Sequence, residues 1–216
     1  MSSTNIQKIG QPAALIAAGS AITYSVFQLL AVFKLIPHPQ DLFWLFLPSL
    51  ILSYTFLNTI ICFHNTVKES YKIYTAIASA FALVYCALVS IVYFTQLVVI
   101  FPLLKANRTD ESHILAFTDK SFMVAIDCIS YAAMNTANLF AAFAFQHDIQ
   151  QQWLYKSLLA NGLLTPVVIL AFFISAFMFI RALWMITLHM AMIYAEKLFS
   201  SKTHKPTLSY YETAAL

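Results

Sequence analysis

Long apolar runs separated by short polar stretches dominate the chain. Each run approaches or exceeds the roughly 20 residues that an α-helix needs to cross about 30 Å of hydrocarbon. The pattern predicts an all-α, polytopic transmembrane helical bundle of six spans, with five spans as the rival. The predicted transmembrane domain covers residues 1–199 and a polar tail covers 200–216, with spans at about 12–36, 41–64, 73–104, 121–146, 156–176 and 178–199.

The last two spans come from one continuous apolar run between about Leu158 and Leu198. A single helix over this run would be about 60 Å long, which suits two crossings better than one. We place the division near Ser175–Met178, although no glycine or proline marks a turn there. This division separates the six-span prediction from the five-span rival.

The starts of the first two spans are predicted from residues that suit helix N-termini. Pro12 suits the first turn of span 1, and Asp41 suits the N-cap of span 2. The run from Ala13 to Ile36 is longer than a signal-peptide core and lacks a small-residue cleavage site. We therefore expect a retained first span rather than a removed signal.

Composition supports the membrane prediction and argues against a nucleic acid partner and a metal or disulfide site. The chain is 61% hydrophobic and 10% charged, whereas a soluble domain carries about 25% charged residues. The net charge of +3 contains no block of like charges, so a nucleic acid partner is not expected. Cys62, Cys86 and Cys128 lie in or beside apolar runs without a CxxC spacing, which indicates packing residues rather than a metal or disulfide site.

One span, residues 121–146, carries unusual polar residues at membrane depth. Asp127, Tyr131 and Asn138 fall on nearly the same helical face. A lipid-facing aspartate costs several kcal/mol on insertion scales, so this face is expected to point into the bundle. Alanines beside it would let neighbouring helices approach closely.

Depth links this face to two other spans. Tyr93 and Gln96 should reach the level of Asp127 on the span before it, and Arg181 should begin the last span at that level. The predicted polar cluster is Asp127, Tyr131, Asn138, Tyr93, Gln96 and Arg181. It is a candidate ligand or proton site, with an Asp127–Arg181 ion pair. The alternative is a structural hydrogen-bond network that fixes helix register.

A second polar group lies toward the other membrane face. It comprises Asn58, His64, Asn161, His189 and Glu196. These residues come from different spans with no HxxxH spacing, so we expect interhelical hydrogen bonds rather than a metal site. Asn161-Gly162 with Pro166 indicates a close helix approach or a kink. No cofactor is predicted.

Basic residues predict the orientation of the bundle. Six spans place both termini on one side of the membrane. That side carries seven basic residues, Lys8, Lys68, Lys72, Lys156, Lys197, Lys202 and Lys205. The opposite side carries five, Lys34, Lys105, Arg108, Lys120 and Arg181. The positive-inside rule then favours cytoplasmic termini.

Three segments carry a resemblance to known sequences: YFTQLVVIFP from Tyr93, LFAAFAF from Leu139, which follows Asp127 and Tyr131, and LLANGLLTP from Leu158. Together they resemble a group of uncharacterised bacterial multi-pass membrane proteins. The resemblance implies a bacterial inner membrane and a compact helical fold, and it implies no activity.

Three classes of function fit these patterns. The leading interpretation is a non-enzymatic integral membrane protein that binds or translocates a small or amphiphilic molecule through the polar cluster. A membrane-embedded enzyme acting on a lipid is the chief rival, with Asp127 or histidines as acid–base groups. The third is a structural or partner-binding subunit, with alanine-rich faces that support homo-oligomers. The lipid bilayer is the partner common to all three.

Overall fold

The computed structural model describes residues 3–108, 114–118, 120–174 and 183–203. These residues form helices joined by turns, with no strand among them. The main helices are α1 (Ser3–Val32), α2 (Gln40–His64), α3 (Lys72–Thr95), α6 (Phe122–Phe145), α7 (Gln152–Gly162), α8 (Thr165–Phe173) and α10 (Leu183–Thr203). Short turns η1 (Glu69–Tyr71) and η3 (Ile149–Gln151) precede α3 and α7, while the π-helical turn η2 (Gln96–Ile100) and α4 (Phe101–Lys105) continue α3.

Within the part of the chain that the structure describes, five helical segments are long and apolar enough to cross a membrane. They cover Ile6–Val32, Gln40–His64, Glu69–Lys105, Phe122–Phe145 and Ile149–Leu170. The all-helical prediction is therefore confirmed for the described residues, where helices occupy the first four predicted spans, and the count of six spans is not confirmed. The apolar part of α10, before Glu196, is only about 20 Å long, so α10 is not among the five. The predicted division at Ser175–Met178 lies outside the described residues.

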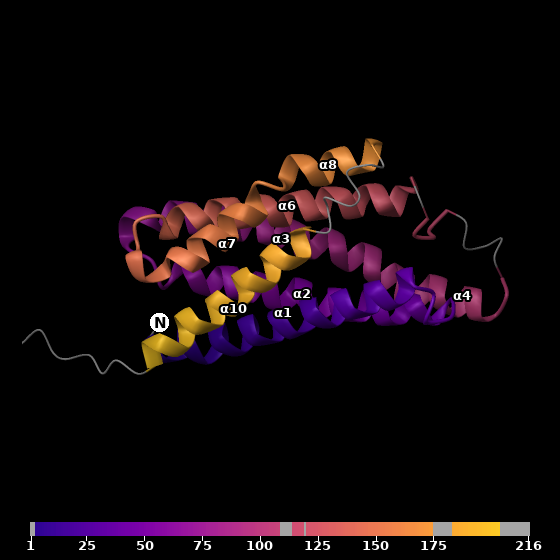
Figure 1. The fold of residues 1–216 in the computed structure, drawn as a ribbon, viewed down its shortest axis with the longest axis horizontal. Coiled ribbons are helices and arrows are strands. Elements are labelled where there is room, and N and C mark those ends of the chain that lie inside the picture. Colours follow the sequence, from indigo (N-terminus) through magenta and orange to yellow (C-terminus); the bar gives the residue numbers. More distant parts are fainter. Residues whose placement is uncertain (1–2, 109–113, 119, 175–182, 204–216) are drawn as a thin grey trace, which may run out of the picture.

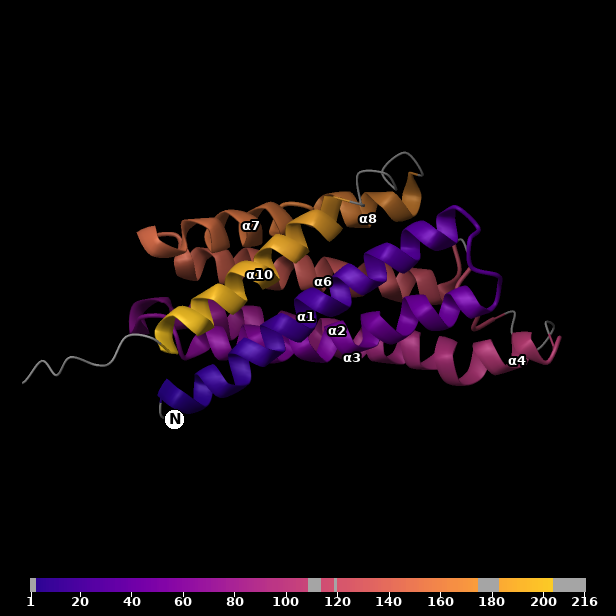
Figure 2. The same cartoon turned by 60° about the horizontal axis from the view of Figure 1, so that its bottom comes forward.

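The helices pack in a closed cyclic order. The sequence of neighbours is α1, α2, α3, α6, α7 and α10, and α10 returns to α1. Figure 1 shows α7 and α8 following one another along α6, while α10 crosses beside α1 in Figure 2. Each of these six helices therefore has two neighbours in the ring and one side directed at a shared interior, and α8 packs on α6 as well.

The start of α1 and the end of α10 lie at the same end of the bundle. The Gln11 amide donates to Glu196 at 3.0 Å, and further along the pair the rings of Tyr24 and Trp184 lie 5.9 Å apart. At this end Phe63, at the end of α2, stacks on Phe199 at 5.7 Å. The α6–α7 turn lies there too, as Figure 1 shows.

The roles predicted for Pro12 and Asp41 at two helix N-termini are wrong. The first helix begins at Ser3 and contains Pro12 in its interior. Contacts with α10 stabilise these additional turns, since Gly10 lies directly against the ring of Phe199. The second begins at Gln40, and the Asp41 carboxylate accepts the N–H of Leu42 from within the first turn instead of acting as N-cap.

The first helix also ends before the predicted Ile36. Lys34 adopts a left-handed conformation with φ 56°. The N–H of Leu35 then reaches back to the carbonyl of Leu30 at 2.8 Å. This arrangement is a common helix C-terminus, which tertiary position here imposes on a lysine instead of the usual glycine.

The predicted fifth span is divided rather than continuous. Helix α7 ends at Gly162 and α8 starts at Thr165, one residue before Pro166. A Cβ atom on Gly162 would lie 2.7 Å from the Cα atom of Leu139 in α6. The predicted close approach at Asn161-Gly162 is therefore confirmed.

Candidate functional site

A buried chain of hydroxyl groups leads to Asp127 in the bundle interior. Helix α6 begins at the N-cap Ser121, whose side chain accepts the N–H of Val124. Two turns later the Asp127 carboxylate accepts a hydrogen bond from the Tyr93 hydroxyl at 2.8 Å. The Tyr93 and Tyr131 hydroxyl oxygens lie 2.9 Å apart. Asp127 is 4% exposed, Tyr93 2% and Tyr131 5%, which confirms that this face of α6 points inward.

The direction of the hydrogen bonds in this chain follows from donor supply. A tyrosine hydroxyl has one proton to donate. Tyr93 gives its proton to Asp127, so Tyr131 must be the donor to Tyr93. Both protons are directed along the chain toward the carboxylate. The hydroxyl groups therefore form a directed chain that ends at the carboxylate.

The cluster forms one wall of a cavity of about 260 Å³. Residues of α1, α2, α3, α6 and α10 line this cavity, together with Phe117 from the segment before α6. Six of the ten described lining residues are aromatic: Tyr24, Phe46, Tyr93, Phe117, Tyr131 and Trp184. Asp127 is the only charged residue among them.

Ring contacts hold the aromatic wall in place. Trp184 packs on Tyr131 with ring centroids 4.9 Å apart and on Tyr24 at 5.9 Å. On the other side Phe46 packs on Tyr93 at 5.1 Å and on Phe117 at 5.3 Å. Such aromatic pairs contribute about 0.5–1.5 kcal/mol each beyond burial. The wall is thus built from rings that orient one another across helices.

Gln96 belongs to the predicted polar cluster, but its hydrogen bonds go to partners other than the Asp127 carboxylate. Its amide nitrogen donates to the carbonyl of Leu115 at 2.7 Å, and its oxygen accepts the N–H of Phe117 at 3.1 Å. Gln96 opens the π-helical turn η2, and turns of this kind are rare and frequent at functional sites. The extra residue in that turn changes which way the following side chains point, an effect that regular helical spacing does not predict. Gln96 instead holds the segment that carries Phe117.

Asn138 also lies apart from the Asp127 cluster. It shares the face of Asp127 but lies eleven residues further along α6, which is about 16 Å. Its amide donates to Asn161 of α7 at 2.7 Å. Asn161 in turn donates to the Thr187 hydroxyl at 2.8 Å and to the Trp184 carbonyl at 3.3 Å. This network joins α6, α7 and α10 and fixes the turn that carries Trp184.

Polar atoms without a hydrogen-bond partner in the described structure lie in the same interior. They are the Tyr85 hydroxyl, both side-chain polar atoms of Asn135 and the Asn138 side-chain oxygen. Asn135 and Asn138 are fully buried. The polar face of α6 therefore continues from the cavity toward the Asn138–Asn161 network.

Arg181, the predicted ion-pair partner of Asp127, lies outside the described residues. The Asp127–Arg181 pair therefore stays a prediction.

The second predicted polar group does not form one site. Asn58 is exposed on the outside of α2. His64 contacts Thr75 at 3.0 Å, His189 contacts Ser25 at 3.4 Å, and Glu196 accepts from Gln11. These contacts join different helix pairs, because residues on neighbouring helices meet only their nearest partners across each interface. No cluster of metal-ligating side chains occurs among the described residues.

Sequence reasoning missed several residues of the aromatic wall. Tyr24, Phe46 and Phe117 line the cavity, yet they were not among the predicted site residues. The chain contains 19 phenylalanines and 11 tyrosines, and aromatic residues within apolar runs look alike whether they face lipid or the interior. Only the cyclic helix order separates the two sets.

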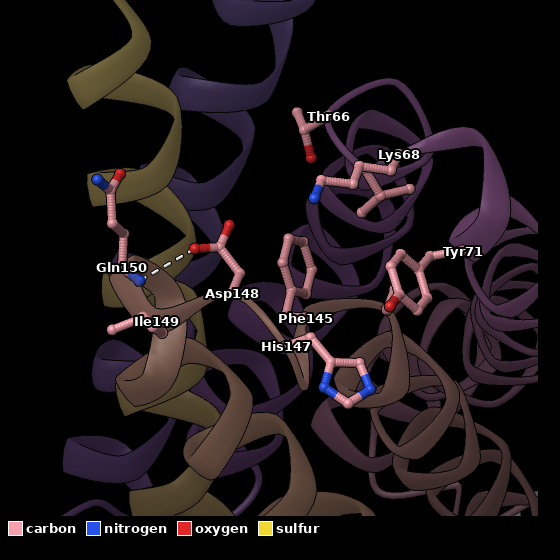
Figure 3. A pocket seen from close by; sticks show the side chains of 10 residues that line it. Thr66, Lys68, Tyr71, Phe145, His147, Asp148, Ile149 and Gln150 are labelled. Carbon is pink, nitrogen blue, oxygen red and sulfur yellow. Dashed lines mark hydrogen bonds between the residues drawn. The ribbon is translucent and has the colours of Figure 1, made fainter.

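A larger cavity of about 400 Å³ lies at the opposite end, between the α2–η1 and α6–η3 turns. Figure 3 shows Lys68, Asp148 and His147 around it. All three side chains are exposed, and Asp148 already caps η3 by accepting the N–H of Gln150 at 3.0 Å. The charged side chains around this larger cavity therefore face solvent, as is usual for residues in turns. The Asp127 cavity, with its buried carboxylate, is therefore the candidate functional site.

No family model, curated protein or solved structure matches this chain. The resemblance to uncharacterised bacterial membrane proteins accordingly stays a prediction.

Proposed function

We propose that the chain crosses a bacterial inner membrane six times, with both termini in the cytoplasm. The five apolar helical segments support membrane insertion. The place of α10 in the ring, between α7 and α1, supports a sixth crossing because α1 itself is long and apolar. Lys8, Lys68, Lys72, Lys156 and Lys197 belong to the end of the bundle where α1 starts, which favours a cytoplasmic location for that end.

We further propose that the protein binds or translocates a small or amphiphilic molecule in the cavity beside Asp127. One observation supports this most directly: a cavity of about 260 Å³ has the nearly buried Asp127 carboxylate in its wall, and most of the described residues around it are aromatic. Ligand sites are mostly apolar with a few placed polar groups, and drug-sized ligands need about 300 Å³ or more. The volume therefore suits a small ligand.

A lipid-modifying enzyme is less well supported. Acid–base chemistry needs a proton-transferring group within reach of the reacting atom. His64 and His189 do not line this cavity, and each contacts a hydroxyl between two helices elsewhere. The acid–base groups among the lining residues that the structure describes are Asp127 and three tyrosines, and the hydroxyls of Tyr93 and Tyr131 are already hydrogen-bonded to one another and to Asp127. Non-covalent binding of a ligand requires only a cavity with suitable lining groups, which this site has.

Thiol accessibility tests whether the cavity admits molecules from water. Cys62, Cys86 and Cys128 are first replaced by alanine, since they are natural thiols in the spans. Tyr24→Cys then places a thiol at the cavity wall, and Thr23→Cys places one at nearly the same depth on the exposed outer face of α1. Both variants, in proteoliposomes, are treated with neutral methyl methanethiosulfonate.

The proposal predicts that Tyr24→Cys reacts at least about tenfold faster than Thr23→Cys, because thiols react as thiolates and lipid suppresses ionisation. Equal, slow reaction of the two thiols would mean a dry interior. That result would reject the binding site and favour the structural-subunit interpretation.

A further inference from the structure

We infer that a single water molecule is bound in the bundle interior between the side chains of Asn135 and Asn138 on α6. The site is separate from the Asp127 cavity, whose described wall includes neither residue, and it does not depend on the proposed ligand. Three observations support it: the burial of the two amides, the orientation of the Asn138 amide and the spacing of the two residues along the helix.

Both amides are buried with hydrogen-bonding capacity left over. Asn135 and Asn138 are each 0% exposed. Both side-chain polar atoms of Asn135 and the side-chain oxygen of Asn138 have no hydrogen-bond partner among the described residues. Burying a polar group without a partner costs its full desolvation penalty, and buried polar groups in native proteins are therefore paired with protein atoms or with ordered water. Two such residues in one place indicate a bound polar molecule.

The orientation of the Asn138 amide follows from its neighbours. The Trp184 carbonyl can only accept a hydrogen bond, so the Asn161 nitrogen faces it at 3.3 Å. The Asn161 oxygen therefore faces α6, where it accepts from the Asn138 nitrogen at 2.7 Å. The Asn138 oxygen that remains is an acceptor, and the molecule bound there must donate a hydrogen bond to it.

The spacing of the two residues places their amides side by side. Residues three apart on a helix are neighbours on its surface, with Cβ atoms about 5–6 Å apart. Water both donates and accepts, so one molecule can donate to the Asn138 oxygen and accept from the Asn135 nitrogen. Neither of the two cavities described above has these residues in its wall, so a molecule as small as water is the ligand that suits the site.

The water extends a polar network that already joins three helices. Asn161 of α7 connects Asn138 of α6 to the Thr187 hydroxyl and the Trp184 carbonyl of α10. Through the water this network reaches Asn135, which lies one helical turn from Tyr131 in the wall of the Asp127 cavity. The water therefore links the network that fixes Trp184 to the polar face of α6 beside the cavity.

Stability measurements are a weak test of this site. Ordering a water costs entropy, which offsets part of the gain from its hydrogen bonds. Asn135→Leu removes the amide together with its water, so a small change in stability is what the site predicts. The water itself has to be observed.

A crystal structure of the unsubstituted chain, at a resolution that shows ordered water, tests the inference. We expect density for one water about 3 Å from the Asn138 oxygen and from the Asn135 amide. Asn135→Leu should lose this density and keep the Asn138–Asn161 hydrogen bond. Thr136→Val is the matched control and should keep the water, because the Thr136 hydroxyl bonds to the Ala132 carbonyl of its own helix.

The absence of water density between the two amides of the unsubstituted chain would overturn the inference. Density larger than a water would also overturn it and would indicate a ligand or lipid site instead. A water that persists unchanged in Asn135→Leu would reject the two-residue site, because Asn138 would then hold it without Asn135. If Asn135→Leu does not fold, the structure of the unsubstituted chain still decides.

Discussion

The side chain of Gln96 binds the backbone on both sides of Ala116, and through it the position of Phe117 is set. Its oxygen accepts the Phe117 N–H at 3.1 Å and its nitrogen donates to the Leu115 carbonyl at 2.7 Å. Phe117 in turn packs on Phe46 and lines the Asp127 cavity. Gln96 is therefore a positioning residue for one wall of the cavity, although it does not reach the carboxylate.

Gln96→Leu should loosen the Phe117 segment and speed entry into the cavity. The substitution removes both hydrogen bonds while keeping a side chain of similar size. We expect the Tyr24→Cys thiol to react several-fold faster with methyl methanethiosulfonate in the Gln96→Leu background. Thr95→Val is the matched control, since the Thr95 hydroxyl bonds only to Ile91 within its own helix. An unchanged rate in Gln96→Leu, or an equal increase in Thr95→Val, would contradict the positioning role.

Removing tyrosine hydroxyls one at a time should rank their contributions to stability. Tyr93→Phe removes the donor to a carboxylate, a bond worth about 1.5–3 kcal/mol, whereas Tyr131→Phe removes a neutral bond worth about 0.5–1.5 kcal/mol. Tyr85→Phe is the control, because the structure gives the buried Tyr85 hydroxyl no partner among the described residues. Its stability should stay within about 0.5 kcal/mol of the parent chain or rise. Unfolding in mixed micelles measures all three, and a loss in Tyr85→Phe as large as in Tyr93→Phe would refute the directed hydroxyl chain.

Two glycines should respond oppositely to alanine. A Cβ atom on Gly162 would lie 2.6–2.8 Å from Cβ, Cα and N of Leu139, most of it unyielding backbone. Gly162→Ala should therefore destabilise the bundle by about 1–3 kcal/mol or more. Gly19, within α1, has no atom within 4 Å of such a Cβ, so Gly19→Ala should be neutral or stabilising by up to about 1 kcal/mol. Thermal unfolding of both variants checks the contrast, and equal effects would be inconsistent with the α6–α7 contact.

Asn135 and Asn161 offer a second opposed pair. Neither polar side-chain atom of Asn135 has a partner in the described part of the chain, so Asn135→Leu should be neutral or stabilising by about 1–3 kcal/mol. Asn161 bonds to Asn138, Thr187 and the Trp184 carbonyl. Asn161→Leu should cost about 1–3 kcal/mol because it leaves buried groups unpaired. The free energy of unfolding distinguishes them, and strong destabilisation by Asn135→Leu would indicate that its amide binds a water or ligand in the interior.

Much of the polar face of α6 could be predicted from sequence. Helical periodicity places Asp127 and Tyr131 on one face, and the cost of exposing a carboxylate to lipid turns that face inward; the structure agrees, with Ala137 and Ala141 fully buried beside it. Periodicity specifies the angle around a helix axis. It does not specify which neighbour stands opposite each turn, so Asn138 was grouped with Asp127 although it bonds to Asn161.

The sequence by itself determined the helical class, the outline of the first four apolar helices and the inward turn of Asp127, because these depend on local spacing and on the cost of placing charge in lipid. Only the tertiary structure decided the cyclic helix order, the role of Gln96 and the aromatic wall. Aromatic and alanine residues satisfy lipid and protein neighbours equally well. Their assignment to a site therefore depends on which helices meet, and that is a property of the assembled bundle.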